Sequence, residues 1–432
     1  MSATTAYEQI DVQALRVGMV VHLEGGWMAH PFPLSRFKIA SAEQIATIRS
    51  LGMKRVRWEP RFSDAIGAGD ELVSLSTSTR PAAPDPTAAA ASPEEQARAA
   101  HRKQLARQRN ALQLCERQFT EAANSCNDLT RRVPAQPLDA GRQAQALSRA
   151  LVDKMLGEQE MCIQLLSGAA GNQVSAHALN VTILSLLLGR KFGLSDADML
   201  DLGVGAMLHD IGKIELPDRV RQRDDHFIAA EVKQYEEHVA HGVLQARKMG
   251  LAPGAARVVA QHHEHDDGSG FPLRLGGDKM TLAARIVALV NRYDNLCNPN
   301  LAAKALTPHE ALALMFAGSA RHFDTTVLGS FIKMMGVYPP GSAVQLSDER
   351  YALVVSVNST RPLKPRVLVH DAKVARDDAL VVDLQTQAGL GIRRSVKPLQ
   401  LPAAARDYLA PAKRVAYFFE PTELARVLDD LS

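Results

Sequence analysis

The histidine residues of this chain are concentrated in one segment. Of the 14 histidines, 8 lie between His177 and His265, whereas an even spread would place roughly three there. Imidazole is the commonest metal ligand among side chains. A ligand set of nitrogen and oxygen without sulfur suits iron, manganese or zinc better than copper(I) or an iron–sulfur cluster. The clustering therefore indicates a metal site.

Two sequence motifs in this segment place ligand types side by side. His209 and Asp210 are adjacent in MLHDIGK, so they offer one nitrogen and one carboxylate oxygen to neighbouring ions. Lys213 follows four residues after His209 and on a helix would share its face and point into the same space. His262 and His263 are consecutive, and consecutive helical residues point about 100° apart. Such a pair can reach two metal ions, or one ion and a substrate.

Two further histidines are candidate ligands with ordinary alternatives. His177 begins a helical stripe that continues with Val181, Leu184 and Leu188, where a satisfied core histidine is the alternative. His238 lies in EEHVAHG, a pattern that an amphipathic surface helix would also give. Neither residue would indicate a metal site on its own.

Together these residue types fit the hydrolysis of a phosphodiester. Two metal ions about 3.5–4 Å apart polarise a phosphate and generate a hydroxide nucleophile at neutral pH. A lysine beside them offsets the charge that develops on the phosphoryl oxygens. The Gly268-Ser269-Gly270 turn after the tandem histidines lets the backbone approach a ligand closely.

Helices are expected to carry these side chains. From Asp139 to about Val337 the apolar periodicity is helical. Before this segment, residues 12–23 predict a strand, a turn and a strand, and residues 41–51 predict a helix capped by Ser41. Residues 54–58 (KRVRW) alternate like an edge strand.

The remaining segments differ in composition. Residues 76–92 are rich in Pro, Ala, Ser and Thr, which is typical of a linker. Ser92, Pro93 and Glu95 predict the start of a long polar helix that runs to about Thr130. From Ser342 onward, YALVVSV, RVLVH and ALVVDL are short β-branched runs separated by turns.

The sequence therefore predicts a mainly α protein: an all-helical catalytic bundle, a small α/β N-terminal domain and a small β-rich C-terminal module. The expected boundaries are an N-terminal regulatory or docking domain at 1–75, a linker at 76–92, a helical connector with the catalytic domain at 93–340, and the β-rich module at 341–432.

Composition excludes several functional classes. The formal net charge is +3, which does not indicate a dedicated DNA-binding protein. The four cysteines form no C-x-x-C pair, so a thiolate zinc site and a disulfide framework are not expected and a reduced, cytoplasmic setting fits. The most apolar stretch, Val181–Leu188, is too short to span a bilayer, and the first residues show no signal-peptide pattern.

The order and spacing of these motifs resemble a known family. HALNV, LHDIGKIELPD, EEHVAHG, HHEHDDGSGFP and ARIVALVNRYDNL follow one another between His177 and Met335. This series resembles the HD-GYP family, a branch of the HD phosphohydrolase superfamily. The stretch VQALRVGMVV, with KRVRW at residues 54–58, resembles the small domain that often precedes HD-GYP domains in bacteria.

The resemblance implies a helical domain with a bi- or trinuclear centre of iron or manganese, which hydrolyses cyclic di-GMP to pGpG and sometimes on to GMP. Asp210 would bridge two divalent ions and Lys213 would contact the scissile phosphate. Phe271 stands where the family usually has Tyr. The implied metal ligands are His177, His209, Asp210, His238, His262 and His263, and the implied pocket loop is Gly268, Ser269, Gly270, Phe271 and Pro272.

Three departures from the family pattern concern the same site. The final metal-binding Asp of the family falls at Asn291, which offers a carbonyl oxygen without charge, so one ion should bind more weakly. Asp294 matches a second family Asp and is a candidate to compensate. Gln173 stands where trinuclear members carry Glu, so a third ion is not expected. The loop after Leu296 lacks the usual Arg, and Lys304 is the nearest cation for the second phosphate.

Three hypotheses about function remain open at this stage. The first is an active cyclic di-GMP phosphodiesterase. The second is a degenerate protein that binds the nucleotide or docks partners without turnover, as Asn291 and the missing Arg would suggest. The third is a phosphohydrolase for another nucleotide or cyclic dinucleotide. Homodimerisation through the β-rich module and docking of signalling proteins by the N-terminal domain are further expectations.

Overall fold

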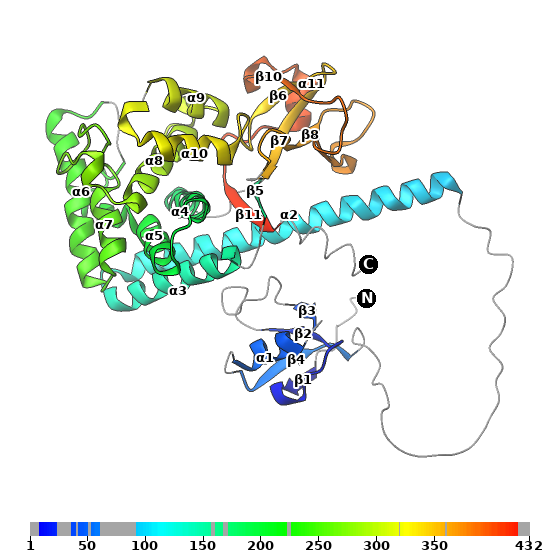
Figure 1. Ribbon diagram of the computed structural model, residues 1–432, viewed down its shortest axis with the longest axis horizontal. Helices are drawn as coiled ribbons and strands as arrows, with labels where there is room; N and C mark the ends of the chain where they lie inside the picture. Colours follow the sequence, from blue (N-terminus) through cyan, green and yellow to red (C-terminus); the bar gives the residue numbers. More distant parts are fainter. Residues whose placement is uncertain are drawn as a thin grey trace. The chain divides into compact units, whose positions relative to one another are not determined.

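The computed structural model describes residues 8–23, 36–39, 42–50, 53–60, 92–156, 160–166, 172–222, 226–318, 320–358 and 361–421. They belong to two compact units, Met1–Arg102 and Lys103–Ser432 (Figure 1). Ser41 and all of the predicted linker except Ser92 lie outside the described residues. The domain boundaries predicted from the sequence stay predictions.

The N-terminal unit is a four-stranded antiparallel sheet with one described helix, α1 (Ala42–Ser50). The strand order is β1-β4-β2-β3, and the core includes Val21, Ile48 and Val56. The strands are β1 (Glu8–Asp11), β2 (Val20–His22), β3 (Arg36–Lys38) and β4 (Arg55–Trp58).

Two local predictions for this unit were wrong. β4 is an internal strand, because it pairs with both β1 and β2. The segment 12–23 begins with a 3-10 helix, Val12–Ala14, rather than a strand, since the Asp11 side chain accepts a hydrogen bond from Gln13 N and caps that turn. The alternation of the sequence carries no information on how many partners a strand has.

The predicted long helix is confirmed as α2 (Pro93–Arg132). Its 40 residues span about 60 Å. The Ser92 hydroxyl accepts from Glu95 N (3.3 Å) and the Glu95 carboxylate accepts from Ser92 N (2.8 Å), which is the capping box that the sequence predicts. Residues 93–104 are exposed, and burial begins at Leu105. α3 (Pro137–Leu156) follows.

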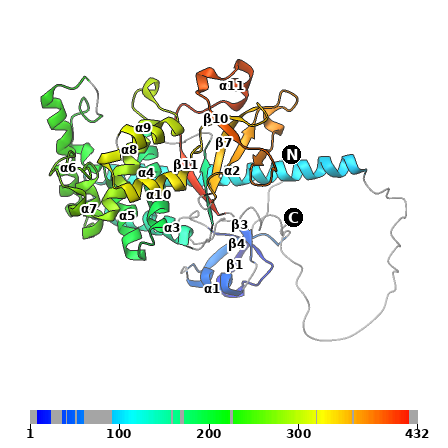
Figure 2. The same cartoon turned by 45° about the horizontal axis from the view of Figure 1, so that its top comes forward.

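The second unit is mainly helical, as predicted (Figures 1 and 2). α4 lies at its centre: nearly every side chain from Leu179 to Gly189 is buried, and α4 packs against both α5 and α8. The helices after α3 are α4 (Gln173–Lys191), α5 (Asp196–Leu208), α6 (Ala229–Lys248), α7 (Pro253–Gln261), α8 (Leu282–Cys297), α9 (Pro308–Gly318) and α10 (Thr325–Met335).

A seven-stranded antiparallel sheet completes this unit. Its path runs β10-β6-β7-β5-β11, with β8 paired to β7 and β9 paired to β8. The members are β5 (Met161–Leu165), β6 (Ala343–Leu346), β7 (Tyr351–Asn358), β8 (Arg366–Val369), β9 (Val381–Asp383), β10 (Ile392–Ser395) and β11 (Tyr417–Pro421), with α11 (Ala403–Leu409) between the last two.

The sheet joins segments that are far apart in the chain. β5 interrupts the predicted helical run and lies between β7 and β11, so the prediction of helix from Asp139 onward was wrong at 161–165. A five-residue apolar run fits a buried strand and a buried helix equally well. The predicted β-rich C-terminal module is present, and β5 extends its sheet.

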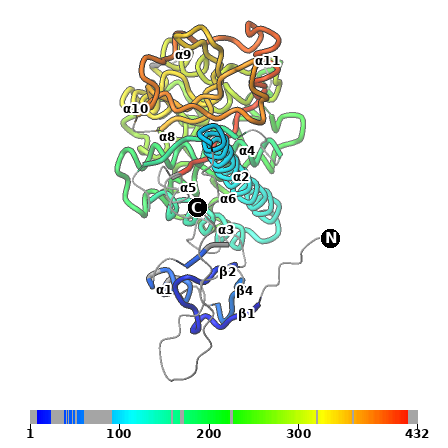
Figure 3. Tube along the Cα trace, turned by 90° about the vertical axis from the view of Figure 1, so that its right-hand side faces the viewer, coloured from blue at the N-terminus to red at the C-terminus, as the bar shows by residue number. Residues whose placement is uncertain are grey.

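β11 is also fixed to the long helix. Phe418 packs edge-on against Phe119 of α2 with ring centroids 6.5 Å apart, and the Lys154 ammonium of α3 lies 4.7 Å from the Phe418 ring centroid. Figure 3 views the molecule from the end of α2 and shows α8 to α10 and α11 on the same side of that helix. α2 and α3 therefore both contact β11 through side chains.

One glycine contact sets the distance between α6 and the turn after α5. α5 ends at Leu208, and a 3-10 helix (Ile211–Glu215) follows. A Cβ on Gly212 would lie 1.9 Å from His238 O and 2.3 Å from Gly242 N. Both of these atoms belong to the backbone of α6, so they cannot move aside as a side chain can. Only glycine fits where these two backbones meet.

We expect Gly212→Ala to lower the unfolding midpoint of the full chain, because overpacking against backbone costs about 2–3 kcal/mol, or roughly 5 °C. Gly329→Ala in α10 is the matched control: a Cβ there meets no described atom within 4 Å, so this midpoint should stay or rise slightly. Calorimetry in excess chelator, which removes stabilisation by metal, makes the comparison. Equal midpoints for the two variants would refute this account of the contact.

Candidate metal centre

The predicted ligands come from separate helices and meet in one place. His177 lies on α4, His209 caps the end of α5 and Asp210 follows it. His238 is a buried residue of α6, and His262 caps the end of α7, with His263 next to it. These six side chains form two groups that share Asp210, and in each group the ligand atoms lie within 4.8 Å of one another.

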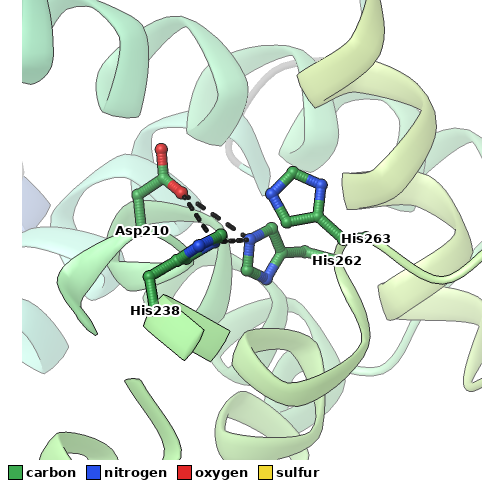
Figure 4. Close-up of side chains that lie close together, drawn as sticks. All are labelled: Asp210, His238, His262 and His263. Carbon is green, nitrogen blue, oxygen red and sulfur yellow. Dashed lines mark hydrogen bonds and ion pairs between the residues drawn. The ribbon is translucent and has the colours of Figure 1, made fainter. Parts of the chain in front are cut away.

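The first group consists of Asp210, His238, His262 and His263 (Figure 4). Asp210 Oδ1 is 3.5 Å from His238 Nε2 and 3.6 Å from His262 Nε2. The two Nε2 atoms are themselves 3.4 Å apart. The carboxylate oxygen and the ring nitrogens thus face a common point, as the ligands of a single cation would.

The second group consists of His177, His209 and Asp210. The Nε2 atoms of the two histidines are 3.2 Å apart. Asp210 Oδ2 lies 3.4 Å from His209 Nε2 and 3.9 Å from His177 Nε2. Each oxygen of one carboxylate therefore faces a different group, which is the arrangement of a carboxylate that bridges two ions.

The other ring nitrogens settle which atoms carry protons. His209 Nδ1 donates to Ala206 O (2.7 Å), and His238 Nδ1 donates to Tyr235 O (2.5 Å). His262 Nδ1 donates to Val259 O in the same way (2.8 Å). Backbone carbonyls only accept, so each Nδ1 holds the proton and each Nε2 presents a lone pair. Lone pairs that converge without a proton between them repel, unless a cation lies among them.

Unsatisfied polar atoms support the same conclusion. Within the described part of the chain, Asp210 Oδ1 and His263 Nε2 are buried and have no hydrogen-bond partner. Leaving a buried polar group unpaired costs on the order of 1–3 kcal/mol, and more for a charged group. Both atoms belong to the first group. The residues therefore fit a divalent cation with nitrogen and oxygen ligands.

The protonation states also favour metal binding. Burial lowers the pKa of His238 to about 3 and moves the pKa of His263 well below its usual range. Burial lowers the pKa of His209 as well. Burial alone would raise the pKa of Asp210, but the Lys213 ammonium, and then His209, hold it well below the ordinary value. Near neutral pH these ligands are already in the forms that bind metal.

Lys213 reaches the site by a different route from the one predicted. The helix ends at Leu208, so Lys213 lies on the following 3-10 helix and not on the face of α5. Its Nζ is nevertheless 2.7 Å from Asp210 Oδ2 and 5.2 Å from the ring centroid of Tyr235. Burial alone would lower the pKa of Lys213, but the Asp210 carboxylate raises it above the ordinary value. Nothing in the sequence marks Tyr235 as part of the site.

Asn291 and Asp294 lie on the buried face of α8. Asn291 Oδ1 accepts a hydrogen bond from Asn295 Nδ2 (2.7 Å), so its carbonyl oxygen already has a donor. Asp294 Oδ2 accepts from His177 Nδ1 (2.6 Å). Asp294 therefore orients a ligand and directs the Nε2 of His177 toward Asp210, and it does not itself point into either group.

A cavity of about 960 Å³ opens beside the two groups. Of the predicted loop residues, Ser269, Gly270 and Phe271 line it, and Gly268 and Pro272 do not. Lys304 is exposed on a short 3-10 helix and is not among the lining residues. Arg221 and Arg292 also line the cavity, although nothing in their local sequence marks them as site residues.

The glycine-rich loop packs directly against His263, one of the candidate metal ligands. The Phe271 ring stacks on His263 with centroids 4.5 Å apart and an angle of 23° between the ring planes, and Phe271 N donates to His263 O (3.1 Å). A Cβ on Gly270 would lie 2.4 Å from His263 O. The buried Glu264 carboxylate accepts from Leu273 N (2.7 Å) and Leu275 N (2.8 Å). The loop thus folds tightly over the tandem histidines.

A third group of ligand types lies nearby: His265, Asp267 and His322. The two imidazole rings are parallel, with centroids 4.6 Å apart and 9° between the planes. Asp267 Oδ2 is 3.6 Å from Arg321 Nε and 3.8 Å from His322 Nε2. The arginine already shares the charge of this carboxylate. His322 lies far along the chain, so spacing could not have placed it here.

Two segments of the chain match known families. Residues 160–327 match the HD domain family. Residues 7–144 match a domain of unknown function, DUF3391. The first match contains all six predicted ligands, and the second spans the N-terminal unit and α2 up to the start of α3.

Two curated relatives of this chain are named as cyclic dinucleotide phosphodiesterases. Cyclic di-GMP phosphodiesterase PA4108 of Pseudomonas aeruginosa is 27% identical over 379 residues, which cover 84% of each chain. 3'3'-cGAMP-specific phosphodiesterase 2 of Vibrio cholerae is 30% identical over 36% of this chain and 30% of its own length. Among solved structures, Bd1817, an HDGYP protein from Bdellovibrio bacteriovorus, aligns with a TM-score of 0.40 at 15% identity, over 76% of this chain and 98% of its own.

We expect the Asp210→Ala variant to lose the ability to bind two Mn²⁺ ions at the same time, because both ligand groups use the Asp210 carboxylate. His238→Ala should remove one ion and leave the His177 group able to hold the other. His241→Ala is the matched control, since His241 lies one turn along α6 and belongs to neither group of described ligands. Calorimetric titration and elemental analysis give the stoichiometries. Two bound ions in Asp210→Ala would contradict the shared carboxylate.

Proposed function

We propose that this protein, whose residues 160–327 match the HD domain family, is a metal-dependent phosphodiesterase of the HD-GYP type that hydrolyses cyclic di-GMP to pGpG. The observation that carries the proposal is the position of Asp210. Its oxygens face two separate groups of histidines, and the Lys213 ammonium lies 2.7 Å from Oδ2. The HD domain and the named activity of the Pseudomonas relative support the same reaction class.

Different residues of the chain would bind the metal ions and stabilise the reacting phosphate. His238, His262 and His263 would hold one ion, His177 and His209 the other, and Asp210 would bridge them. Bound divalent ions would polarise the phosphodiester and lower the pKa of the attacking water. Lys213 would stabilise the charge that develops on the phosphoryl oxygens. Its high pKa keeps it cationic for that role.

The cavity suits a dianionic nucleotide. Its volume of about 960 Å³ lies at the upper end of the usual range for ligand pockets. Lys213, Arg221 and Arg292 supply cations for two phosphates, so Arg292 precedes Lys304 as the candidate for the second one. Amide side chains can donate to and accept from a guanine edge. The lining amides include Asn127, Asn172, Asn295 and Asn300.

Iron and manganese are the proposed metals, with zinc as the alternative. All the ligand atoms are imidazole nitrogens or carboxylate oxygens, a set that suits these ions. Docking of partner proteins by the N-terminal unit, homodimerisation through the C-terminal sheet and a cytoplasmic site of action remain proposals. None of the described helices is long and apolar enough to cross a membrane.

We expect protein prepared anaerobically with Fe²⁺, or with Mn²⁺, to convert cyclic di-GMP to pGpG. Lys213→Met should lower the turnover number by about 10²–10³-fold and keep both ions. Lys279→Met, at an exposed lysine outside the cavity lining, is the control and should match the wild type. Chromatography of products from cyclic di-GMP, 3'3'-cGAMP and mononucleotides gives the substrate range. A metal-loaded wild type that converts only another nucleotide would reject the proposed substrate.

A degenerate protein without turnover is the second candidate. The observation that favours it is the neutral Asn291, whose carbonyl oxygen is occupied by Asn295. Under this alternative, Asn291→Asp would restore a second ion and create activity that the wild type lacks. Under the proposed function, the same variant only tightens metal binding, because the wild type already turns over.

We expect Asn291→Asp to bind its weaker Mn²⁺ about tenfold more tightly, since a charged oxygen replaces a neutral one. Metal titration and the hydrolysis assay on the same preparations make the measurement. Gln385→Glu, at an exposed position outside both ligand groups, adds the same charge and serves as the control. Hydrolysis by the wild type would exclude the degenerate alternative.

A further inference from the structure

The backbone at residues 415–417, which leads into β11, is hydrogen-bonded to two asparagine side chains of the helical bundle. Val415 N donates to Asn298 Oδ1 (2.8 Å), and Asn298 Nδ2 donates back to Val415 O (2.9 Å). Tyr417 N donates to Asn180 Oδ1 (3.0 Å), and Asn180 Nδ2 donates to Val415 O (3.0 Å). Asn180 lies on α4, and Asn298 caps the end of α8. β11 runs beside α4 (Figures 1 and 2).

The same two amides hold a carboxylate that orients a metal ligand. Asn180 Nδ2 and Asn298 Nδ2 each donate to Asp294 Oδ1, both at 2.8 Å. Asp294 Oδ2 then accepts from His177 Nδ1 (2.6 Å). Asp294 is fully buried, with 0% of its surface exposed. A continuous chain of hydrogen bonds therefore connects the backbone of residues 415–417 to the imidazole of His177.

The strand decides which way the amides face. Each Asn oxygen is taken by a backbone N–H of residue 415 or 417, so each Nδ2 must face Asp294. Without those two donors, either amide could turn by 180° and present its oxygen to the carboxylate, and that contact is repulsive. Asp294 needs both donors because it is charged and buried.

A second contact fixes the strand against α8. The hydroxyls of Tyr417 and Tyr293 are 3.1 Å apart, and Tyr417 OH also lies 3.3 Å from Pro340 O. Tyr293 is the residue next to Asp294. Both tyrosine rings are fully buried, and β11 is paired with β5 from Tyr417 to Pro421. The backbone donors are therefore held at a fixed distance from Asp294.

His177 is the ligand that depends on distant residues. His209, His238 and His262 each donate Nδ1 to a carbonyl three residues earlier in the chain, so their own helices orient them. His177 instead donates to Asp294, 117 residues away. Loss of the support from residues 415–417 should therefore affect the His177 group and leave the His238 group intact.

We propose that residues 415–417, which lie beyond the segment matched to the HD domain, are a positioning part of the metal centre and fix His177 through Asn180, Asn298 and Asp294. This inference rests on the two-ion site of the proposed function. It assigns the C-terminal sheet a role in metal binding that does not require a partner or a second copy of the chain.

The test is a Mn²⁺ titration of the full chain, followed by calorimetry and electron paramagnetic resonance. The wild type should bind two ions. Asn298→Ala should weaken one of them by about 10–100-fold, the usual effect of removing a partner that orients a ligand, and leave the other unchanged. Asn358→Ala is the matched control: it lies in the same sheet on β7, where its amide donates to Glu160 (3.3 Å), and both ions should bind as in the wild type.

A double-mutant cycle with Asp294→Asn separates positioning from general destabilisation. If Asn298 acts through Asp294, adding Asn298→Ala to Asp294→Asn should weaken the second ion no further. The thermal midpoint of each apo protein is recorded alongside, and Asn298→Ser replaces Asn298→Ala if the alanine variant does not fold. Unchanged affinity in Asn298→Ala, equal weakening of both ions, full additivity in the cycle, or a wild type with a single site would each overturn the proposal.

The outcome is independent of catalysis. If the wild type binds two ions and fails to hydrolyse cyclic di-GMP, the proposed function is wrong, and the titrations still decide whether residues 415–417 support His177. If the wild type hydrolyses the substrate and Asn298→Ala binds both ions normally, the function stands and the positioning role is wrong.

Discussion

The structure depends on one mostly buried carboxylate that has to stay charged. Asp210 has a different set of histidines on each of its oxygens, and a protonated acid could not serve both. Burial opposes the charge, and the Lys213 ammonium at 2.7 Å offsets that opposition. The surrounding helices can only converge on this point because Gly212 lets the turn after α5 lie against the backbone of α6. The positions of the metal ligands therefore depend directly on how closely these helices pack.

The imidazole rings of the ligand histidines are oriented by two kinds of hydrogen-bond partner. Three of them use a carbonyl within their own helical segment, which requires no tertiary structure beyond the helix. His177 uses Asp294, and Asp294 is held by amides that are in turn held by the strand at the other end of the chain. Of these four histidines, His177 is thus oriented by the completed fold and the other three by their own helical segments.

The sequence predicted well what residue type alone determines. Tandem His262 and His263, and adjacent His209 and Asp210, indicated a metal site before any fold was known, and the structure brings them together. The mainly helical bundle, the long helix α2 and the β-rich C-terminal region were also predicted correctly. The failures concern residues whose role depends on distant contacts. β5 is a strand because β7 and β11 flank it, and nothing local marks Asn180 or Asn298 as partners of Asp294.

The pairing of β5 with β11 has a consequence for how the protein is made. A ribosome synthesises α4 to α10 before it reaches residue 417, and the antiparallel partner of β5 then arrives more than 250 residues after β5 itself. Contacts so distant in sequence form late in folding. The nascent chain can assemble the histidine group that its own helices orient, whereas the group containing His177 gains its final hydrogen bonds only after translation has passed Tyr417.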